Sequence, residues 1–421
     1  MKNTAIAGAR TLPQPHVPGV PRVDRPPRRS TPVLQAVRLE LRPAPELASR
    51  NARAFDSFWI AGYEGGDHLV DMCQVTQHQS QAAADYARLA DFGIRTVRET
   101  IGWRRVDRGG RYDFSALRDR LDALRSRQLQ AIWTLCHYGW PDDVDVLSAD
   151  FIDRFGRYAR AVARYLADAA EAAPVYVPIN ELSFLASAAC GNGPSHCRRA
   201  GLDRREGEVR KQLVRASVAA CAAIREVDPK ARFMHTDPLV RVVAPAGRPE
   251  LHAEACRRNE LQFAAWDMVS GRSAPELGGD PSYLDFVGLH YYRENQWELG
   301  TGRTLRWRVD DPRRVALSRM LQEVHGRYGR PLVIAETGHF GIERSAWLRE
   351  IGEETRIARQ HGVPVQGVCL YPVIDTPAWD NINQWNRSGL WDLEPQQSGV
   401  LQRRLDPAYA AALREVQRSC E

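Results

Sequence analysis

From Phe55 onward, short apolar runs alternate with longer segments in which apolar residues recur every three or four positions. Eight runs have the length and composition of strands: 55–63, 94–100, 129–136, 174–180, 231–237, 285–292, 331–338 and 365–373. Helical spacing fills segments between them, including 80–93, 114–128, 149–170, 205–228 and 313–329. Eight alternating strand and helix units predict an α/β fold, the (β/α)8 TIM barrel.

The first 54 residues differ in composition: they are rich in Pro and Arg and poor in periodic apolar positions, as in PQPHVPGVPRVDRPPRR. We expect residues 1–54 to form an N-terminal tail and residues 55–421 to form one barrel domain. The N-terminus lacks the sustained apolar segment of a signal peptide, and no apolar run approaches the roughly 20 residues of a membrane helix. The sequence therefore predicts a cytoplasmic protein with no membrane partner.

Composition and charge narrow the choice of partner. Hydrophobic residues make up 43% of the 421 positions and charged residues 26%, which is typical of a globular protein with a large core. The net charge of +6 comes from arginines that are spread along the chain, so we expect no nucleic-acid partner.

The eight cysteines form no CxxC pair and are expected to be reduced. Cys190, His196 and Cys197 in CGNGPSHC are either an incidental loop or a metal or disulfide site, and we favour the loop.

The active-site groups of such barrels stand at the C-terminal ends of the strands. In PVYVPINELSF, a buried strand gives way to Asn180 and Glu181, and Glu336 stands at the same stage of the seventh unit, 155 positions later. Barrel closure can bring both carboxyl groups to one rim. Hydrolysis of a glycosidic bond needs such a pair, one acid and one carboxylate.

Five motifs in consistent order resemble the clan A glycoside hydrolases, most closely family 1, the β-glucosidase-like enzymes. They are the Arg-Glu and Trp-Arg-Arg segment from Val97, the strand ending in His137 before Tyr-Gly-Trp-Pro, NEL at 180–182, DFVGLHYY at 285–292 and AETG at 335–338. The resemblance covers roughly residues 55–415.

The resemblance implies that Glu181 is the general acid/base and Glu336 the nucleophile of a retaining double displacement. It implies further substrate-binding or supporting roles at the strand ends. Arg98 resembles the arginine beside the nucleophile, Tyr292 or Tyr291 would donate to the same carboxylate, and Asn180 would hold the sugar 2-hydroxyl. Further candidates for contact with the sugar are His137, His290, Glu64 and Trp379, the last as an aromatic platform.

Several positions depart from the family pattern. The first strand reads IAGYEGG without the usual glutamine, the eighth reads LYPVIDTPAWDN without the glutamate that grips the sugar, and His290 replaces an asparagine. The glycone is therefore left open. Candidates for a rebuilt sugar site are Glu64, Asp67, His68, His235, Asp375 and Asp380.

The preferred hypothesis is a retaining β-glycosidase that hydrolyses a small β-linked glycoside and needs no metal or organic cofactor. One alternative is a sugar-binding barrel with little or no turnover, which the altered glycone positions favour. Another is a transglycosylase that uses the same covalent intermediate. A metal-dependent enzyme is a fourth alternative, because His137, His235 and His290 all fall at strand ends. The sequence does not define the aglycone or the oligomeric state.

Overall fold

The computed structural model describes residues 54–63, 65–66, 70–168, 174–192, 197–308, 311–379 and 381–420. Eight parallel strands close into a barrel in the order β1-β12-β11-β9-β7-β6-β5-β2. Their bounds are β1 (Trp59–Gly62), β2 (Thr96–Thr100), β5 (Gln130–Cys136), β6 (Val175–Ile179), β7 (Arg232–Pro238), β9 (Phe286–His290), β11 (Leu332–Thr337) and β12 (Val365–Leu370). Each lies within one residue of a predicted run or inside it, so the predicted TIM barrel is confirmed.

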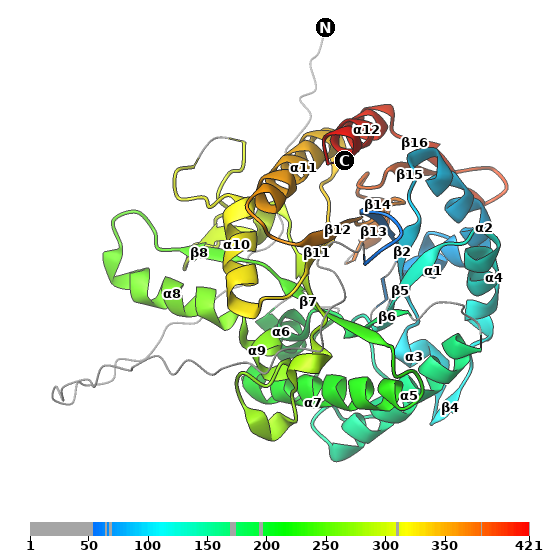
Figure 1. The fold of residues 1–421 in the computed structure, drawn as a ribbon, viewed down its shortest axis with the longest axis horizontal. Helices are drawn as coiled ribbons and strands as arrows, with labels where there is room; N and C mark the ends of the chain where they lie inside the picture. The colour runs from blue at the N-terminus through cyan, green and yellow to red at the C-terminus, as the bar shows by residue number, and fades with distance from the viewer. Residues whose placement is uncertain are drawn as a thin grey trace, which may run out of the picture.

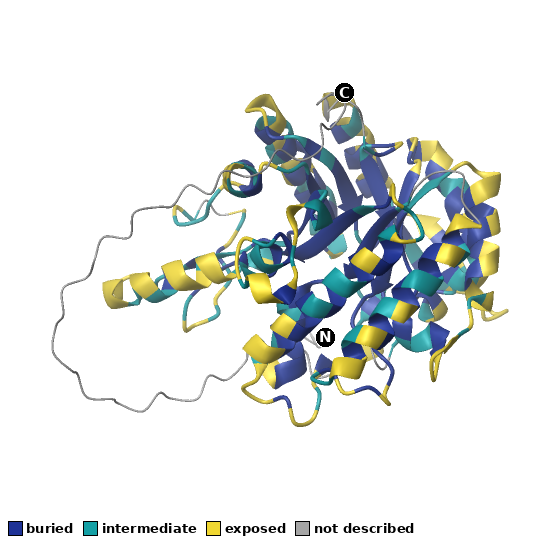
Figure 2. Cartoon of the chain, turned by 60° about the horizontal axis from the view of Figure 1, so that its bottom comes forward, coloured by how far each residue is buried: buried dark blue, intermediate teal, exposed yellow. Residues whose placement is uncertain are grey.

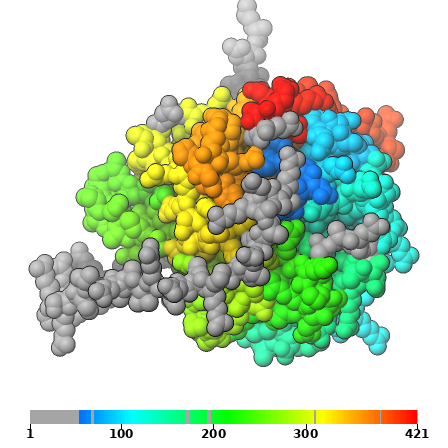
Figure 3. All heavy atoms as spheres, in the orientation of Figure 1, coloured from blue at the N-terminus to red at the C-terminus, as the bar shows by residue number. Residues whose placement is uncertain are grey.

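Helices surround this barrel (Figure 1). The longer ones are α2 (His78–Leu89), α4 (Arg118–Ser126), α5 (Ala149–Ala167), α7 (Glu206–Arg225), α8 (His252–Leu261), α10 (Leu317–Tyr328), α11 (Arg344–Gln360) and α12 (Pro407–Cys420). The short ones are α1 (Met72–Val75), α3 (Trp103–Val106), α6 (Leu182–Ser187) and α9 (Ala264–Val269). In Figures 1 and 3, α12 in red lies against α11 in orange. The last helix therefore packs beside the helix that follows β11.

The α5 helix shows why these segments are helical. Its buried side chains, Phe151, Phe155, Tyr158, Val162 and Leu166, recur at three and four positions and form one apolar stripe. Ser148 caps the first turn by accepting the backbone N–H of Phe151 at 3.3 Å. Figure 2 shows the same division across the molecule, with buried strands at the centre and exposed positions on the outward faces of the helices.

The barrel interior is filled by a small apolar cluster that includes Ile60, Ile132, Val177, Met234 and Val333. A second and larger core lies between the strands and the helices. A Cβ at Gly288 would stand 2.6 Å from Thr236 Cγ2, so the absent side chain lets neighbouring strands pack closely here. With the lumen sealed by apolar side chains, polar groups on the inner face gather at the strand ends.

Short two-stranded sheets lie in the loops outside the barrel. They are β3 (Asp107–Arg108) with β4 (Arg111–Tyr112), β8 (Arg241–Val243) with β10 (Gln296–Glu298), β13 (Pro377–Ala378) with β14 (Asn381–Trp385), and β15 (Trp391–Pro395) with β16 (Leu401–Leu405). The predicted tail falls outside the described residues except for Ala54. No helix in the described part of the chain is long and apolar enough to cross a membrane.

Candidate active site

Five buried polar side chains meet at the C-terminal ends of the barrel strands. Arg98 comes from β2, Asn180 and Glu181 directly follow β6, His290 ends β9 and Glu336 lies in β11. The relative exposures of Glu181 and Glu336 are 7% and 4%, and the other three are at or below 1%. Groups of this kind are costly to bury without partners, and here they are partners of one another.

Arg98 is the hub of this cluster. Its Nη1 donates to Glu336 Oε1 at 2.9 Å and to the Ala335 carbonyl at 2.9 Å, while Nη2 donates to Asn180 Oδ1 at 2.7 Å. Thr236 also donates to Asn180 Oδ1, at 2.9 Å. Two donors on Oδ1 fix the orientation of the Asn180 amide, so that its Nδ2 faces His137 Nε2 at 3.4 Å.

Tyr292 is the tyrosine that reaches Glu336, with its hydroxyl 2.9 Å from Oε2. Tyr291 does not take this position. Its hydroxyl instead accepts from Gln296 and Arg314, and its ring stacks on Trp347 at 5.7 Å. Neighbouring residues at a strand end point in opposite directions, so only one of the two tyrosines can face the barrel mouth. The prediction for Tyr291 is therefore corrected: its hydroxyl lies outside the cluster, and of the two tyrosines Tyr292 is the one that donates to Glu336.

His290 lies between the two glutamates. Its Nδ1 is 2.8 Å from Glu181 Oε1 and 3.3 Å from Glu336 Oε2, so these two oxygens are separated by at most 6.1 Å, the sum of the two distances. Arg98 Nη1 approaches Nε2 at 3.3 Å; because guanidinium only donates, Nε2 is the acceptor and Nδ1 carries the proton. Burial lowers the pKa of His290 to about 3, which agrees with a neutral ring.

Glu181 occupies a sharp turn between β6 and α6. Its backbone is left-handed, with φ 50° and ψ 63°, a conformation that costs a residue other than glycine about 1–3 kcal/mol. The turn aims the carboxyl at His290 and at the Tyr138 hydroxyl, which donates to Oε2. Burial raises the pKa of Glu181, although the Tyr138 hydrogen bond and the charge of Arg98 oppose that rise.

Aromatic rings border the cluster on the β5 side. His137 stacks with Trp379 at 5.9 Å between centroids, and Tyr138 meets the Trp379 ring edge-on at 6.2 Å. The two candidates His137 and Trp379 are thus brought together beside Asn180. Sequence reasoning missed Tyr138 and Thr236; the only signal for Tyr138 was its position directly after His137.

Other candidates lie away from this cluster. His235 faces outward from β7, with Nε2 3.8 Å from the Cys221 sulfur on α7, and burial lowers its pKa to about 4. Asp375 accepts from the backbone N–H of Ser388 at 2.9 Å and from its hydroxyl at 3.1 Å, so it closes a loop. Neither joins the glutamates, because each is engaged in packing between strand and helix or between loops.

Four candidates, Glu64, Asp67, His68 and Asp380, lie outside the described residues, as does His196. Cys190 and Cys197 are both buried. Within the described ranges, no three His, Cys, Asp or Glu side chains form a group that could hold a metal ion.

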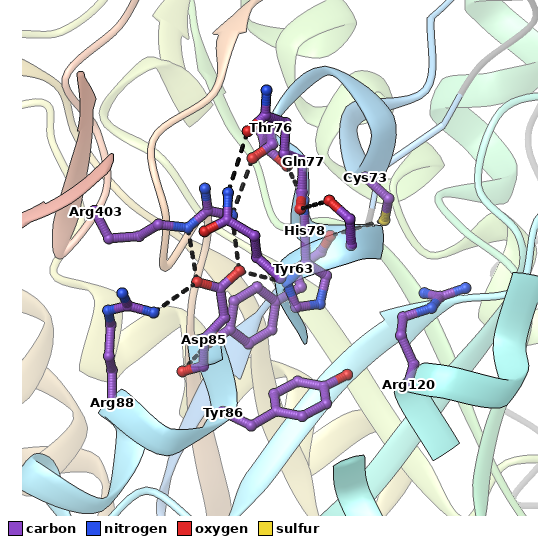
Figure 4. A network of polar contacts seen from close by, with 12 residues as sticks. Tyr63, Cys73, Thr76, Gln77, His78, Asp85, Tyr86, Arg88, Arg120 and Arg403 are labelled. Carbon is purple, nitrogen blue, oxygen red and sulfur yellow. Dashed lines mark hydrogen bonds and ion pairs between the residues drawn. The ribbon is translucent and has the colours of Figure 1, made fainter. Parts of the chain in front are cut away.

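A second buried polar network supports β2 from behind. His78 lies between Asp85 and Glu99, with Nδ1 and Nε2 each 2.9 Å from a carboxylate oxygen, and Arg403 binds Asp85 through Nε at 2.7 Å. Figure 4 shows the guanidinium groups of Arg403 and Arg88 both reaching Asp85. Because Glu99 follows Arg98 on the strand, this network anchors the outer face of β2 while Arg98 occupies the inner face.

The network also sets the protonation of its members. Burial opposes the charge on Glu99, yet His78, Arg120 and Tyr86 lower the pKa of Glu99 to about 2. Burial likewise disfavours the imidazolium form of His78, but the Glu99 and Asp85 carboxylates outweigh it and raise the pKa of His78. His78 therefore donates from both nitrogens as a cation.

Comparison with known proteins tests the expected fold. No protein-family model and no curated protein sequence matches the chain. Among solved structures, the family 1 β-glucosidase from Thermotoga maritima is similar with a TM-score of 0.67 and 16% identity, over 87% of this chain and 98% of that one. The AHE enzyme from Alicyclobacillus herbarius gives a TM-score of 0.67 and 20% identity, over 82% and 88%.

The Thermotoga maritima β-glucosidase in complex with glucoimidazole also has a TM-score of 0.67, with 15% identity over 87% of this chain and 99% of that one. These likenesses establish that the chain has the barrel fold of family 1 β-glucosidases. The expected fold resemblance is thereby confirmed.

Proposed function

We propose that the protein is a retaining β-glycosidase that hydrolyses a small β-linked glycoside, with Glu336 as nucleophile and Glu181 as general acid/base. The observation that carries this proposal is the buried pair of glutamates at the barrel mouth. Glu181 Oε1 and Glu336 Oε2 lie at most 6.1 Å apart, because both contact Nδ1 of His290. Inverting enzymes hold their carboxyl groups roughly 6.5–9.5 Å apart to admit a water, whereas retaining enzymes hold them about 5–5.5 Å apart. The spacing here supports a double displacement.

In the first step, the Glu336 carboxylate attacks the anomeric carbon as the bond to the leaving oxygen breaks. Glu181 delivers its proton to that oxygen. In the second step, the Glu181 carboxylate takes a proton from water, the resulting hydroxyl attacks the anomeric carbon, and Glu336 is released. The environments suit these roles, because burial raises the pKa of Glu181 and two donors, Arg98 and Tyr292, hold Glu336.

The remaining residues of the cluster suit a sugar ring. Asn180 presents Nδ2 to the mouth because Arg98 and Thr236 occupy its Oδ1, so a hydroxyl beside the anomeric carbon would find a donor there. His137 and Trp379 provide a polar edge and an aromatic face next to it. A sugar-like ligand in a fold neighbour, glucoimidazole, adds weight to a carbohydrate substrate.

A sugar-binding barrel without useful turnover is the second candidate, favoured by the loss of the glutamine and glutamate of the family's glycone pattern. A transglycosylase would use the same two steps with an acceptor hydroxyl in place of water. Neither alternative needs the Glu181 and Glu336 arrangement to differ from the one described, so activity measurements must separate them.

The test is a panel of 4-nitrophenyl β-glycosides carrying glucose, galactose, fucose, xylose, mannose or glucuronic acid. Cleavage of at least one, nearly abolished by Glu336→Ala and partly restored to that variant by azide, is expected. Glu181→Ala should also lose most activity, while Glu353→Ala, which removes a carboxylate from the exposed face of α11, should not. A wild-type protein that binds a sugar but cleaves no member of the panel would favour the binding barrel.

A further inference from the structure

The turn that carries Glu181 needs support from outside its own segment. Glu181 is the N-cap residue of α6, and an N-cap side chain ordinarily accepts a backbone N–H from the first helical turn. The Glu181 side chain makes no such bond, because its carboxyl is engaged by Tyr138 and His290. The strained left-handed backbone at this residue persists only where surrounding groups hold it.

Two consecutive residues of β7 supply that support. Thr236 Oγ1 accepts the backbone N–H of Glu181 at 3.3 Å, and the Asp237 carboxylate accepts the backbone N–H of Ser183 with both oxygens at 3.1 Å. β7 lies next to β6 in the barrel and packs beside α6 (Figure 1). Thr236 can therefore reach the backbone of Glu181, and Asp237 can reach the backbone of Ser183. Asp237 thus caps α6 in place of the glutamate.

The setting of Asp237 is unusual for a structural cap. Its relative exposure is 1%, and burial raises its pKa to about 7, with the Ser183 hydrogen bond and Arg210 of α7 opposing the rise and the charge of Glu181 adding to it. The other titratable groups nearby, His235 on the same strand and His290 on β9, are neutral because burial lowers the pKa of each. The charged groups that act on the pKa of Asp237 are Glu181 and Arg210.

We propose that Asp237 is a positioning residue for Glu181: by accepting the Ser183 N–H it holds the turn that directs the acid/base carboxyl at the leaving oxygen. It does not touch the substrate. The inference rests on the proposed function, because it assigns Asp237 a part in the acid step of that reaction.

The test uses two glycosides of one sugar that differ in their need for an acid. A 2,4-dinitrophenyl glycoside leaves without protonation, whereas a phenyl glycoside depends on the general acid. The sugar is the one cleaved fastest in the panel above. Asp237→Ala should lower kcat/KM for the phenyl glycoside by about ten- to a hundredfold and for the dinitrophenyl glycoside by less than about threefold, because only the acid is misplaced. Asp237→Asn retains an acceptor oxygen and should recover most of the loss.

Asp285 provides the matched control. It is partly buried, burial raises its pKa, and it accepts a backbone N–H, that of Phe233 at 2.8 Å. It directly precedes β9, at the opposite end of the barrel. Residues at that end of a barrel ordinarily contribute to stability and take no part in catalysis. Asp285→Ala should therefore lower the melting temperature while changing kcat/KM for the two glycosides by the same factor.

An equal loss on both glycosides in Asp237→Ala, or no loss on either, would overturn the inference and leave the proposed function standing. Asp237→Asn distinguishes a misplaced acid from a misfolded protein, because it keeps the shape and the hydrogen bond of the side chain. A wild-type protein that cleaves neither glycoside would refute the proposed function itself, and the role of Asp237 with it.

Discussion

Replacement of Arg98 by methionine removes the hub of the site while keeping a side chain of similar length. Arg98 is fully buried and donates to Glu336, Asn180 and a backbone carbonyl, so the variant leaves a buried carboxylate without its cation. Breaking a buried ion pair in this way costs about 3–5 kcal/mol. The Tyr292 hydrogen bond to Glu336 remains. Because the Glu336 carboxylate loses the guanidinium beside it, kcat/KM should also fall by about a hundredfold or more.

The cost converts to a melting temperature. With an unfolding entropy of about 2.1 cal/mol/K per residue over residues 55–421, each kcal/mol corresponds to about 1.3 °C, so Arg98→Met should melt about 4–6 °C below the wild type in a calorimetric scan. Arg104→Met is the matched control, since Arg104 pairs with Asp142 at 2.6 Å but the two side chains are 37% and 59% exposed. Such a pair is worth about 0–1 kcal/mol, or about 1 °C at most. Equal shifts for the two variants would refute the buried cluster as described.

Substitutions at three further residues test the site and the buried network on the outer face of β2. Tyr138→Phe removes a donor that favours the ionised form of Glu181, so the pKa of Glu181 should rise further. The basic limb of the kcat/KM profile on a phenyl glycoside should then move to higher pH, and a limb that stays or moves to lower pH would contradict the role of Tyr138. His290→Asn keeps a donor near Glu181 and should stay within about tenfold of wild-type kcat/KM, whereas His290→Ala should lose more; equal values would show that the bridge has no part in catalysis. The pKa of His78 is raised in the folded state, so its stabilisation is fully present below pH 6.5 and is lost as pH rises through the higher folded pKa. The difference in unfolding free energy between the wild type and His78→Asn should therefore shrink with rising pH. A difference that grows with pH would contradict the imidazolium assignment.

The barrel could be predicted because its signal is repeated eight times. Each strand is a short apolar run followed by a helical pattern, and the end of each run identifies where polar side chains collect. Arg98, Asn180, Glu181 and Glu336 were all found in this way, since the C-terminal ends of parallel strands meet at one rim. Which of two adjacent residues faces that rim depends on the register at the last residue, and this is why Tyr291 and Tyr292 could not be distinguished.

The supporting groups carry weaker signals. Tyr138 stands in a loop after β5, where no periodicity indicates its direction, and Asp237 reaches Ser183 only because β6 and β7 are neighbours in the closed barrel. The network around His78 joins residues from α2, β2 and β16, and its longest link, between Asp85 and Arg403, spans 318 positions. Contacts of this kind depend on the tertiary arrangement of the chain and leave no local pattern in the sequence.

The stereochemistry of the first product tests the central claim most directly. Proton NMR during cleavage of the preferred β-glycoside, recorded before mutarotation, reports which anomer of the sugar is released. A double displacement through Glu336 predicts that the β-anomer forms first. Initial release of the α-anomer would contradict the retaining mechanism and the roles assigned to Glu181 and Glu336.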